Sequence, residues 1–402
     1  MPGKRTADFF AALFGFSEHQ QQYQATQERL LRLARFTDVS NLHYRREKCD
    51  FVLDNGNIAS AGVFSMPSVK ELRDHVEHLL GNSNNASNLP RRAVRVKVKN
   101  IVGESRRLHL KSEEGAIHQA ASQFNLLEFP SPTTIPEDGI QNYVHDHTQG
   151  PACAVACATG TAYRNYLVPV PFSNTQECEA VPTRGQTKKN QLNGLEDMEG
   201  HIVQRMKETL GNDPVSPWKV KNGYIESSNS RLKRLNEFLQ NGVISEEELV
   251  SLLRIGVQED TKVTDNSSLD VQLTQTYNSA ISIGYSTVAT YYWEPIARIV
   301  LKASYEATML VGLIKAIEAW KQNKPAPPIY LTKVGGGVFR NDNTWIIDAM
   351  KRAIHRVGQY QHSFAGDGEL DVRIVHFRSI ENQYRMLGEG IDCTAGKEEN
   401  LE

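Results

Sequence analysis

A glycine turn between a predicted strand and a predicted helix is the feature of this chain best suited to chemistry. Gly335, Gly336 and Gly337 directly follow the β-prone residues 329–334. Glycines let a backbone adopt positive φ and bring its N–H groups close to a ligand. Such a turn before a helix suits phosphate, because free N–H groups and the helix dipole both favour an anion. The segment has neither a Walker lysine nor a full GxGxxG, so an ordinary tight turn explains it equally well.

The sequence around this turn predicts alternating helices and strands, which would hold the turn in place. Apolar residues at helical spacing predict a helix over 295–320 before the turn and another after it, capped by Asn343 or Thr344. Short β-prone runs predict strands over 93–100, 107–110, 115–121, 271–283 and 370–377. This alternation predicts an α/β fold, with a mixed sheet and helices on both faces. In such sheets ligands bind at the carboxyl ends of the strands, where we expect the turn 335–341.

A long irregular stretch follows the predicted strand 115–121. Four prolines between residues 130 and 151 exclude one continuous helix, and the many aromatic and aliphatic residues argue against disorder. A loop of this length inside a domain is usually functional when it is not disordered. We therefore interpret it as a binding loop at the same sheet edge as the glycine turn, leading into a helix or strand around 152–158.

The rest of the chain suggests a division into regions. We predict a mainly helical N-terminal extension over 1–90, an α/β domain over 91–386 with a helical insertion at about 195–253, and a tail over 387–402. In the extension we expect helices over 1–48 and a hairpin or a pair of short strands over 51–66. Residues 254–264, which contain Glu259 and Asp260, are expected to include a loop.

Composition and charge narrow the class of protein. Hydrophobic residues make up 40% of the chain and charged residues 23%, as in soluble globular proteins. The net charge of −2 gives no sign of binding to nucleic acid or to a membrane surface, and the longest apolar run is far too short to span a bilayer. Five cysteines, an odd number, do not indicate a disulfide framework, so we expect a cytoplasmic location.

Two pairs of residues are of types that bind metals. Cys153 and Cys157 lie four positions apart, and His145 and His147 are separated by one residue. Neither pair has further ligands at a spacing that would complete a site. We expect a packing role for the cysteines and a polar loop role for the histidines, and we expect no metal or cofactor.

Two stretches resemble a macrodomain, the α/β fold that binds ADP-ribose. GAIHQAASQFNLLE (115–128) resembles the family's AIVNAANxxLxGG strand and loop, with Gln119 and Ser122 where its two asparagines stand. Segment 329–354 resembles its late strand, its glycine–aromatic turn and the following helix, and Arg340 replaces the last glycine of that turn. The resemblance covers roughly the last three hundred residues, with large insertions. The departures from the first motif point to a divergent branch, similar to the poly(ADP-ribose) glycohydrolase-like and bacterial-effector ADP-ribosylhydrolase groups.

The resemblance implies roles for particular residues. The backbone of 335–341 would wrap a diphosphate, and the loop around Gly150 would form a second wall beside it. Gln119, Phe124 and Asn125 would lie near the distal ribose, although a lone phenylalanine is more often a core residue. The ligand-binding residues implied are Gln119, Phe124, Asn125, Gln149, Gly150, Gly335, Gly336, Gly337, Val338, Phe339, Arg340 and Asn341.

The function that the resemblance implies is that of an ADP-ribosyl hydrolase, which cleaves ADP-ribose from a modified protein side chain, arginine being one possibility. The transition state is oxocarbenium-like, so carboxylates help by orienting water or moving a proton. Our catalytic candidates are Asp260, Asp265 and Asp270, with Asp260 preferred because it follows an apolar run. A second group of acids is Glu137, Asp138 and Asp146.

Two other interpretations remain open. Each candidate acid can be a solvated loop residue, and the chain would then be a non-catalytic reader that binds ADP-ribose. A nucleotide-sugar or dinucleotide enzyme could use the same phosphate loop. For both the hydrolase and the reader, the expected partner is ADP-ribose or an ADP-ribosylated protein. We expect neither nucleic acid nor a membrane as a partner.

Overall fold

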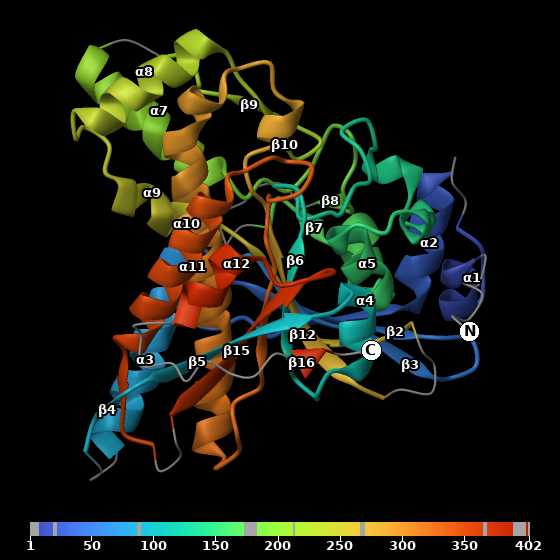
Figure 1. Ribbon diagram of the computed structural model, residues 1–402. Coiled ribbons are helices and arrows are strands. Elements are labelled where there is room, and N and C mark those ends of the chain that lie inside the picture. The colour runs from blue at the N-terminus through green and yellow to red at the C-terminus, as the bar shows by residue number, and fades with distance from the viewer. Residues whose placement is uncertain are drawn as a thin grey trace.

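A large mixed sheet runs through the middle of the molecule, and helices cover both of its faces (Figure 1). The computed structural model describes residues 8–18, 22–86, 90–172, 183–211, 214–265, 270–364, 368–388 and 399–400. The order of the strands is β1-β2-β3-β11-β12-β6-β13-β15-β5-β16. They are β1 (Ala34–Asp38), β2 (Arg46–Val52), β3 (Ile58–Ser65), β5 (Arg95–Val102), β6 (Ile117–Ala121), β11 (Gly256–Lys262), β12 (Gln272–Asn278), β13 (Ile329–Leu331), β15 (Glu369–His376) and β16 (Glu399–Asn400). The predicted α/β class is confirmed.

The directions of the strands decide which residues share an edge of this sheet. Neighbours in the run β12, β6, β13, β15 and β5 are parallel, so their carboxyl ends lie at one edge. Strand β11 runs the opposite way. It begins with Gly256 beside Tyr277, at the end of β12, and it finishes with Lys262 beside Gln272, at the start of β12. The residues that follow β11 therefore lie at the edge opposite the carboxyl ends.

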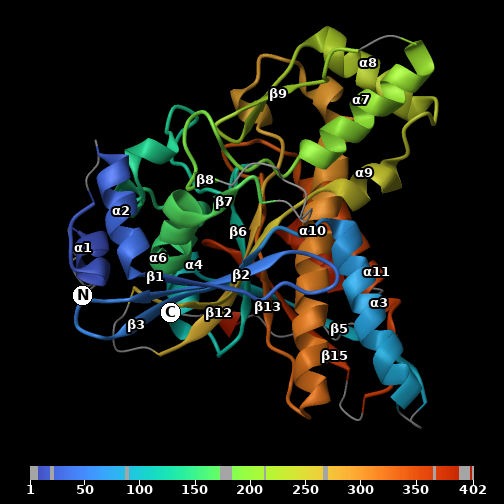
Figure 2. The ribbon, with the colours of Figure 1, turned by 180° about the vertical axis from the view of Figure 1, so that it is seen from behind.

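Two layers of helices bury the two faces (Figure 2). One layer contains α3 (Val69–Ala86), α10 (Thr290–Lys321) and α11 (Asn343–Gly358), whose apolar residues join one core cluster with the sheet. The other contains α1 (Phe9–Phe14), α2 (Tyr23–Leu33), α5 (Gln149–Ala156) and α6 (Ala158–Ala162). The remaining helices are α4 (Ser105–Lys111), α7 (Glu196–Leu210), α8 (Asn229–Gln240), α9 (Glu246–Leu252) and α12 (Asn382–Arg385). The short strands are β4 (Arg92–Ala93), β7 (Pro169–Val170), β8 (Thr183–Arg184), β9 (Lys219–Lys221), β10 (Tyr224–Glu226) and β14 (Gln361–His362).

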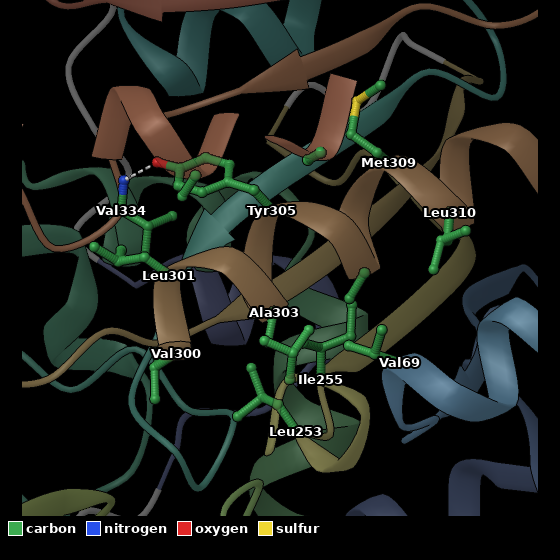
Figure 3. Close-up of a cluster of buried hydrophobic side chains, with 14 of the residues drawn as sticks. Val69, Leu253, Ile255, Val300, Leu301, Ala303, Tyr305, Met309, Leu310 and Val334 are labelled. Carbon is green, nitrogen blue, oxygen red and sulfur yellow. Dashed lines mark hydrogen bonds between the residues drawn. The ribbon is translucent and has the colours of Figure 1, made fainter. Parts of the chain in front are cut away.

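Helix α10 contributes many buried residues to the core and links it to the predicted glycine turn. It is apolar on most of its sides, as expected of a helix that contacts β13, α3, α9 and α11. Figure 3 shows its residues Val300, Ala303 and Leu310 among the side chains of neighbouring elements. The hydroxyl of Tyr305 accepts a hydrogen bond from the Val334 N–H at 3.0 Å and donates one to the Thr332 carbonyl at 2.7 Å. The helix thereby fixes the chain that leaves β13.

Several predicted elements are wrong. Residues 34–65 form β1, β2 and β3 and join the large sheet, whereas helices were expected as far as residue 48. The run 107–110 lies in α4, because its alternation of leucines with polar residues is too short to separate a strand from a helix. Residues 256–262 form a strand, although we expected a loop among their acids. The cap of α11 is Asp342, whose carboxylate accepts from the Thr344 N–H.

The segment predicted as a helical insertion is largely helical, and the glycine turn lies between β13 and α11. Helices α7, α8 and α9 fill most of 195–253, with the hairpin β9–β10 between α7 and α8. Of the predicted tail, residues 389–398 and 401–402 lie outside the described part of the chain. In the part of the chain that the structure describes, no helix is long and apolar enough to cross a membrane.

Candidate functional site

A cleft of about 320 Å³ opens at the carboxyl edge of the parallel strands. Residues that follow β6, β12 and β13 line it, together with the N-terminus of α5 and Tyr224 of β10. Its volume is at the lower end of the roughly 300–1,000 Å³ typical of small-molecule sites. Six of the predicted ligand-binding residues line it: Gln149, Gly150, Gly335, Gly337, Val338 and Phe339. The strand directions explain why segments so far apart in sequence meet here.

The glycine turn has a shape that other residues would not allow at its first position. Gly335 has φ +76°, and an added Cβ would lie 2.4 Å from the Ala280 Cβ. The amide of Asn341 donates to the Ile281 carbonyl at 2.8 Å and to the Gly335 carbonyl at 3.2 Å, which closes the turn. At Gly337, by contrast, an added Cβ would meet nothing within 4 Å. The first glycine is therefore needed for packing and conformation, and the third leaves open space.

The same turn presents unused backbone donors. In the described part of the chain, the N–H groups of Gly337, Val338 and Phe339 have no hydrogen-bond partner. Val338 is 61% exposed, so this stretch of backbone is open to solvent. Consecutive N–H groups without internal partners form a concavity that binds anions.

The opposite wall of the cleft is the N-terminus of α5. The side-chain amide of Gln149 accepts from the Ala121 N–H at 2.6 Å and donates to the Gln119 carbonyl at 2.8 Å, which pins this helix to the end of β6. An added Cβ at Gly150 would lie 2.2 Å from the Ala121 carbonyl oxygen, so only glycine allows this close approach. The first N–H groups of the helix, at Gln149 and Gly150, have no internal partner among the described residues.

Three aromatic rings pack edge to face at the cleft. Only one of them was predicted to bind a ligand. Tyr224, Tyr285 and Phe339 line the cleft, with ring centroids 5.7 to 6.0 Å apart. Sequence reasoning found only Phe339. Tyr224 belongs to the helical insertion and Tyr285 to a single turn after β12, and neither stands in a motif that could have marked it.

The charged groups at the cleft are few. Asp146 lines it, and its Oδ1 accepts from the Thr148 N–H at 2.7 Å. Lys333 also lines it and pairs with Glu381. Glu128 also lines the cleft. Its side chain is fully buried, with Oε1 2.7 Å from Arg164, and its Oε2 has no hydrogen-bond partner among the described residues. Burial raises the pKa of Glu128 to about 7, although Arg164 acts in the opposite direction. Of the two acids among the described residues that line the cleft, Asp146 is partly exposed and Glu128 is buried.

The other predicted ligand residues support the walls instead of lining the cleft. Gln119 is buried and accepts from the Thr332 N–H at 3.1 Å. Phe124 belongs to the core, and the Asn125 carboxamide accepts from the Leu127 N–H at 3.1 Å. Gly336, Arg340 and Asn341 belong to the turn without lining the cleft. Gln119 and Asn125 use their side chains to form hydrogen bonds with backbone N–H groups of the protein. A sequence motif does not show whether such a side chain binds the backbone or a ligand.

The three catalytic candidates lie at the opposite edge of the sheet. Asp260 occupies a bulge late in β11, and its carboxylate is 4.0 Å from the Lys315 ammonium. Asp265 pairs with Arg106. Asp270 precedes β12 and lies 3.1 Å from the Lys262 ammonium. Because β11 is antiparallel to β12, all three are separated from the cleft by the length of the strands, and they are not positioned to act on a ligand bound there.

No protein-family model matches the chain, and no curated protein matches it.

Proposed function

We propose that the cleft binds ADP-ribose, as a divergent macrodomain would. The observation that carries this proposal is the pair of facing walls, each with free backbone N–H groups, at Gly337–Phe339 and at the start of α5. A diphosphate needs several donors and little bulk, and both walls supply this with glycine at the closest points. Lys333 adds a positive charge beside them. The rings of Tyr224, Tyr285 and Phe339 give the sugar or base of the nucleotide an apolar surface.

We propose further that the protein hydrolyses the bond between ADP-ribose and a protein side chain. In this reaction water supplies a hydroxyl to the anomeric carbon and a proton to the departing side-chain atom, while the glycosidic bond breaks. Asp146 is the accessible carboxylate of the cleft and would orient that water or stabilise the positive charge of the sugar. The three acids at the opposite edge have no part in this step.

The alternative is a reader that binds ADP-ribose without cleaving it. One observation favours it: of the two acids that line the cleft, Glu128 is fully buried and pairs with Arg164, and Asp146 is the one whose side chain is partly exposed. Both functions fit a protein of the cytoplasm. All cysteines in the described part of the chain, namely Cys49, Cys153 and Cys157, are buried and free, as in a reducing compartment.

Titration calorimetry with ADP-ribose tests the proposal directly, with AMP and NAD as controls. We expect micromolar or tighter binding to ADP-ribose, about −8 kcal/mol, and weaker binding to both controls. Release of ADP-ribose from modified proteins then separates hydrolase from reader. In the hydrolase, Asp146→Asn abolishes release and retains binding. If the wild-type protein does not bind ADP-ribose, the proposed function is wrong.

A further inference from the structure

A second and larger cavity, of about 710 Å³, adjoins the cleft. It is formed mainly by the 3-10 helices η1 (Pro136–Asp138) and η2 (Gln141–His145) and by the residues that follow them. Pro130 and Asp146 line both cavities, so the two spaces meet at these residues. The residue Asp146 therefore lies at the boundary between the cleft and the second cavity.

The lining of this second cavity is suited to a cation. It contains the carboxylates Asp138 and Asp146, and no lysine or arginine of the described residues lines it. One oxygen of Asp138 accepts from the Ile135 N–H at 2.9 Å. In the part of the chain that the structure describes, its other oxygen has no partner and remains available to a ligand.

Flat side chains complete the cavity. The rings of Tyr143, His145 and His147 belong to its lining. Tyr143 is 1% exposed, and its buried hydroxyl finds no hydrogen-bond partner among the described residues. An unsatisfied buried hydroxyl is uncommon, because it loses the free energy of its hydrogen bonds to water. Tyr143 thus lines the cavity and carries a buried hydroxyl for which the described residues supply no partner.

We infer that this cavity receives the guanidinium group of an ADP-ribosylated arginine and that Asp138 is its carboxylate partner. The inference rests on the proposed ADP-ribose site. A guanidinium is planar, carries several donors in fixed directions, pairs with carboxylates and stacks on rings, so it uses each of the groups described. A serine or glutamate linkage carries no cation and would leave the carboxylates without a partner. The glycosidic bond lies where the two cavities meet, beside Asp146.

Two peptides of one sequence test this inference, one modified with ADP-ribose on arginine and the other on serine at the same position. Binding is measured by fluorescence anisotropy with labelled peptides, before turnover. We expect the wild-type protein to bind the arginine-linked peptide about tenfold more tightly, the effect of one charge-assisted hydrogen bond. Asp138→Asn removes this preference, and Asp138→Lys reverses it. Affinity for free ADP-ribose stays unchanged in both variants.

The matched control is Glu137→Gln, at the neighbouring acid of the same short helix. The Glu137 carboxylate accepts from the Lys188 N–H at 2.9 Å, and it lines neither cavity. This variant should keep the full preference for the arginine-linked peptide. Equal affinity of the wild-type protein for the two peptides, together with binding of free ADP-ribose, overturns the inference and leaves the proposed function standing. Failure to bind ADP-ribose overturns the proposed function itself.

Discussion

The two edges of the central sheet differ in how far their charged and polar groups are paired within the protein. At the edge of β11 and its bulge, the carboxylates are paired: Glu259 lies 2.8 Å from Arg46 and 2.6 Å from Lys315, and Asp265 pairs with Arg106. At the cleft edge, backbone N–H groups at Gly337–Phe339 are unpaired and few charges are present. Groups that satisfy one another stabilise a fold, and groups without partners are available to a ligand.

Two buried glutamates show the same contrast. Burial disfavours the ionised form of Glu259, but the cations Lys315 and Arg46 more than offset it, and its pKa lies below the ordinary value. Glu128 has only Arg164, and burial prevails, so its pKa rises to about 7. The number of cations around a buried acid thus decides the direction of its shift, and a perturbed acid need not be a catalytic one.

The largest effect on stability is expected at the paired edge. Glu259→Gln keeps the shape of the side chain and removes the carboxylate closest to Arg46 and Lys315, and it leaves Lys315 only the more distant Asp260 and Glu318 among the described residues. The free energy of unfolding should therefore fall by about 3 kcal/mol. Asp270→Asn, at a 93% exposed side chain, should change it by less than about 0.5 kcal/mol. Urea denaturation measures both. ADP-ribose affinity should be unchanged in both, and a loss of affinity would link this edge to the cleft.

A negative charge introduced at the cleft edge should weaken the binding of ADP-ribose and should change the free energy of unfolding little. Gly337→Glu places a carboxylate where the diphosphate is proposed to lie, and affinity for ADP-ribose should fall by about 1,000-fold, roughly 4 kcal/mol. Gly337→Ala is the control, because its Cβ meets nothing within 4 Å, and it should bind within about threefold of the wild type. Titration calorimetry measures the affinity of both variants for ADP-ribose. Unchanged affinity in Gly337→Glu would show that the turn has only a structural role.

The two buried glutamates should give opposite dependences of stability on pH. The raised pKa of Glu128 means that the folded protein holds this proton more tightly. Its contribution is complete below the ordinary value near 4.5 and is lost as pH rises through about 7. The lowered pKa of Glu259 gives stability that is present above 4.5 and lost as pH falls. Glu128→Gln should therefore reduce the fall in stability between pH 5 and 8, by at most about 3 kcal/mol. A pH series of thermal unfolding, compared with wild type, measures this, and identical profiles contradict it.

Much of the sheet and one wall of the cleft could be predicted from the sequence. The segment 329–354 carries its own local signals, namely a β-prone run, three glycines and an apolar helical period, and the structure places them as expected. The other wall was predicted as a binding loop at the same sheet edge from its prolines and apolar residues, and the resemblance added Gln149 and Gly150. Asp260, by contrast, was placed by local polarity, although its position depends on the antiparallel pairing of β11 with β12. Tyr224 and Tyr285 reach the cleft through contacts between segments far apart in the chain. Such contacts produce no periodic pattern of residues in the sequence.

The order of the segments along the chain also bears on how the protein is made. Strand β13 lies between β6 and β15, and its residues are synthesised about two hundred positions after those of β6. Until residue 331 has left the ribosome, one side of β6 has no strand to pair with, and an unpaired edge of this kind promotes association with other chains. The cleft itself is incomplete until Phe339 has followed. We therefore expect nascent chains of this protein to require protection by chaperones until late in translation, and truncated chains to aggregate.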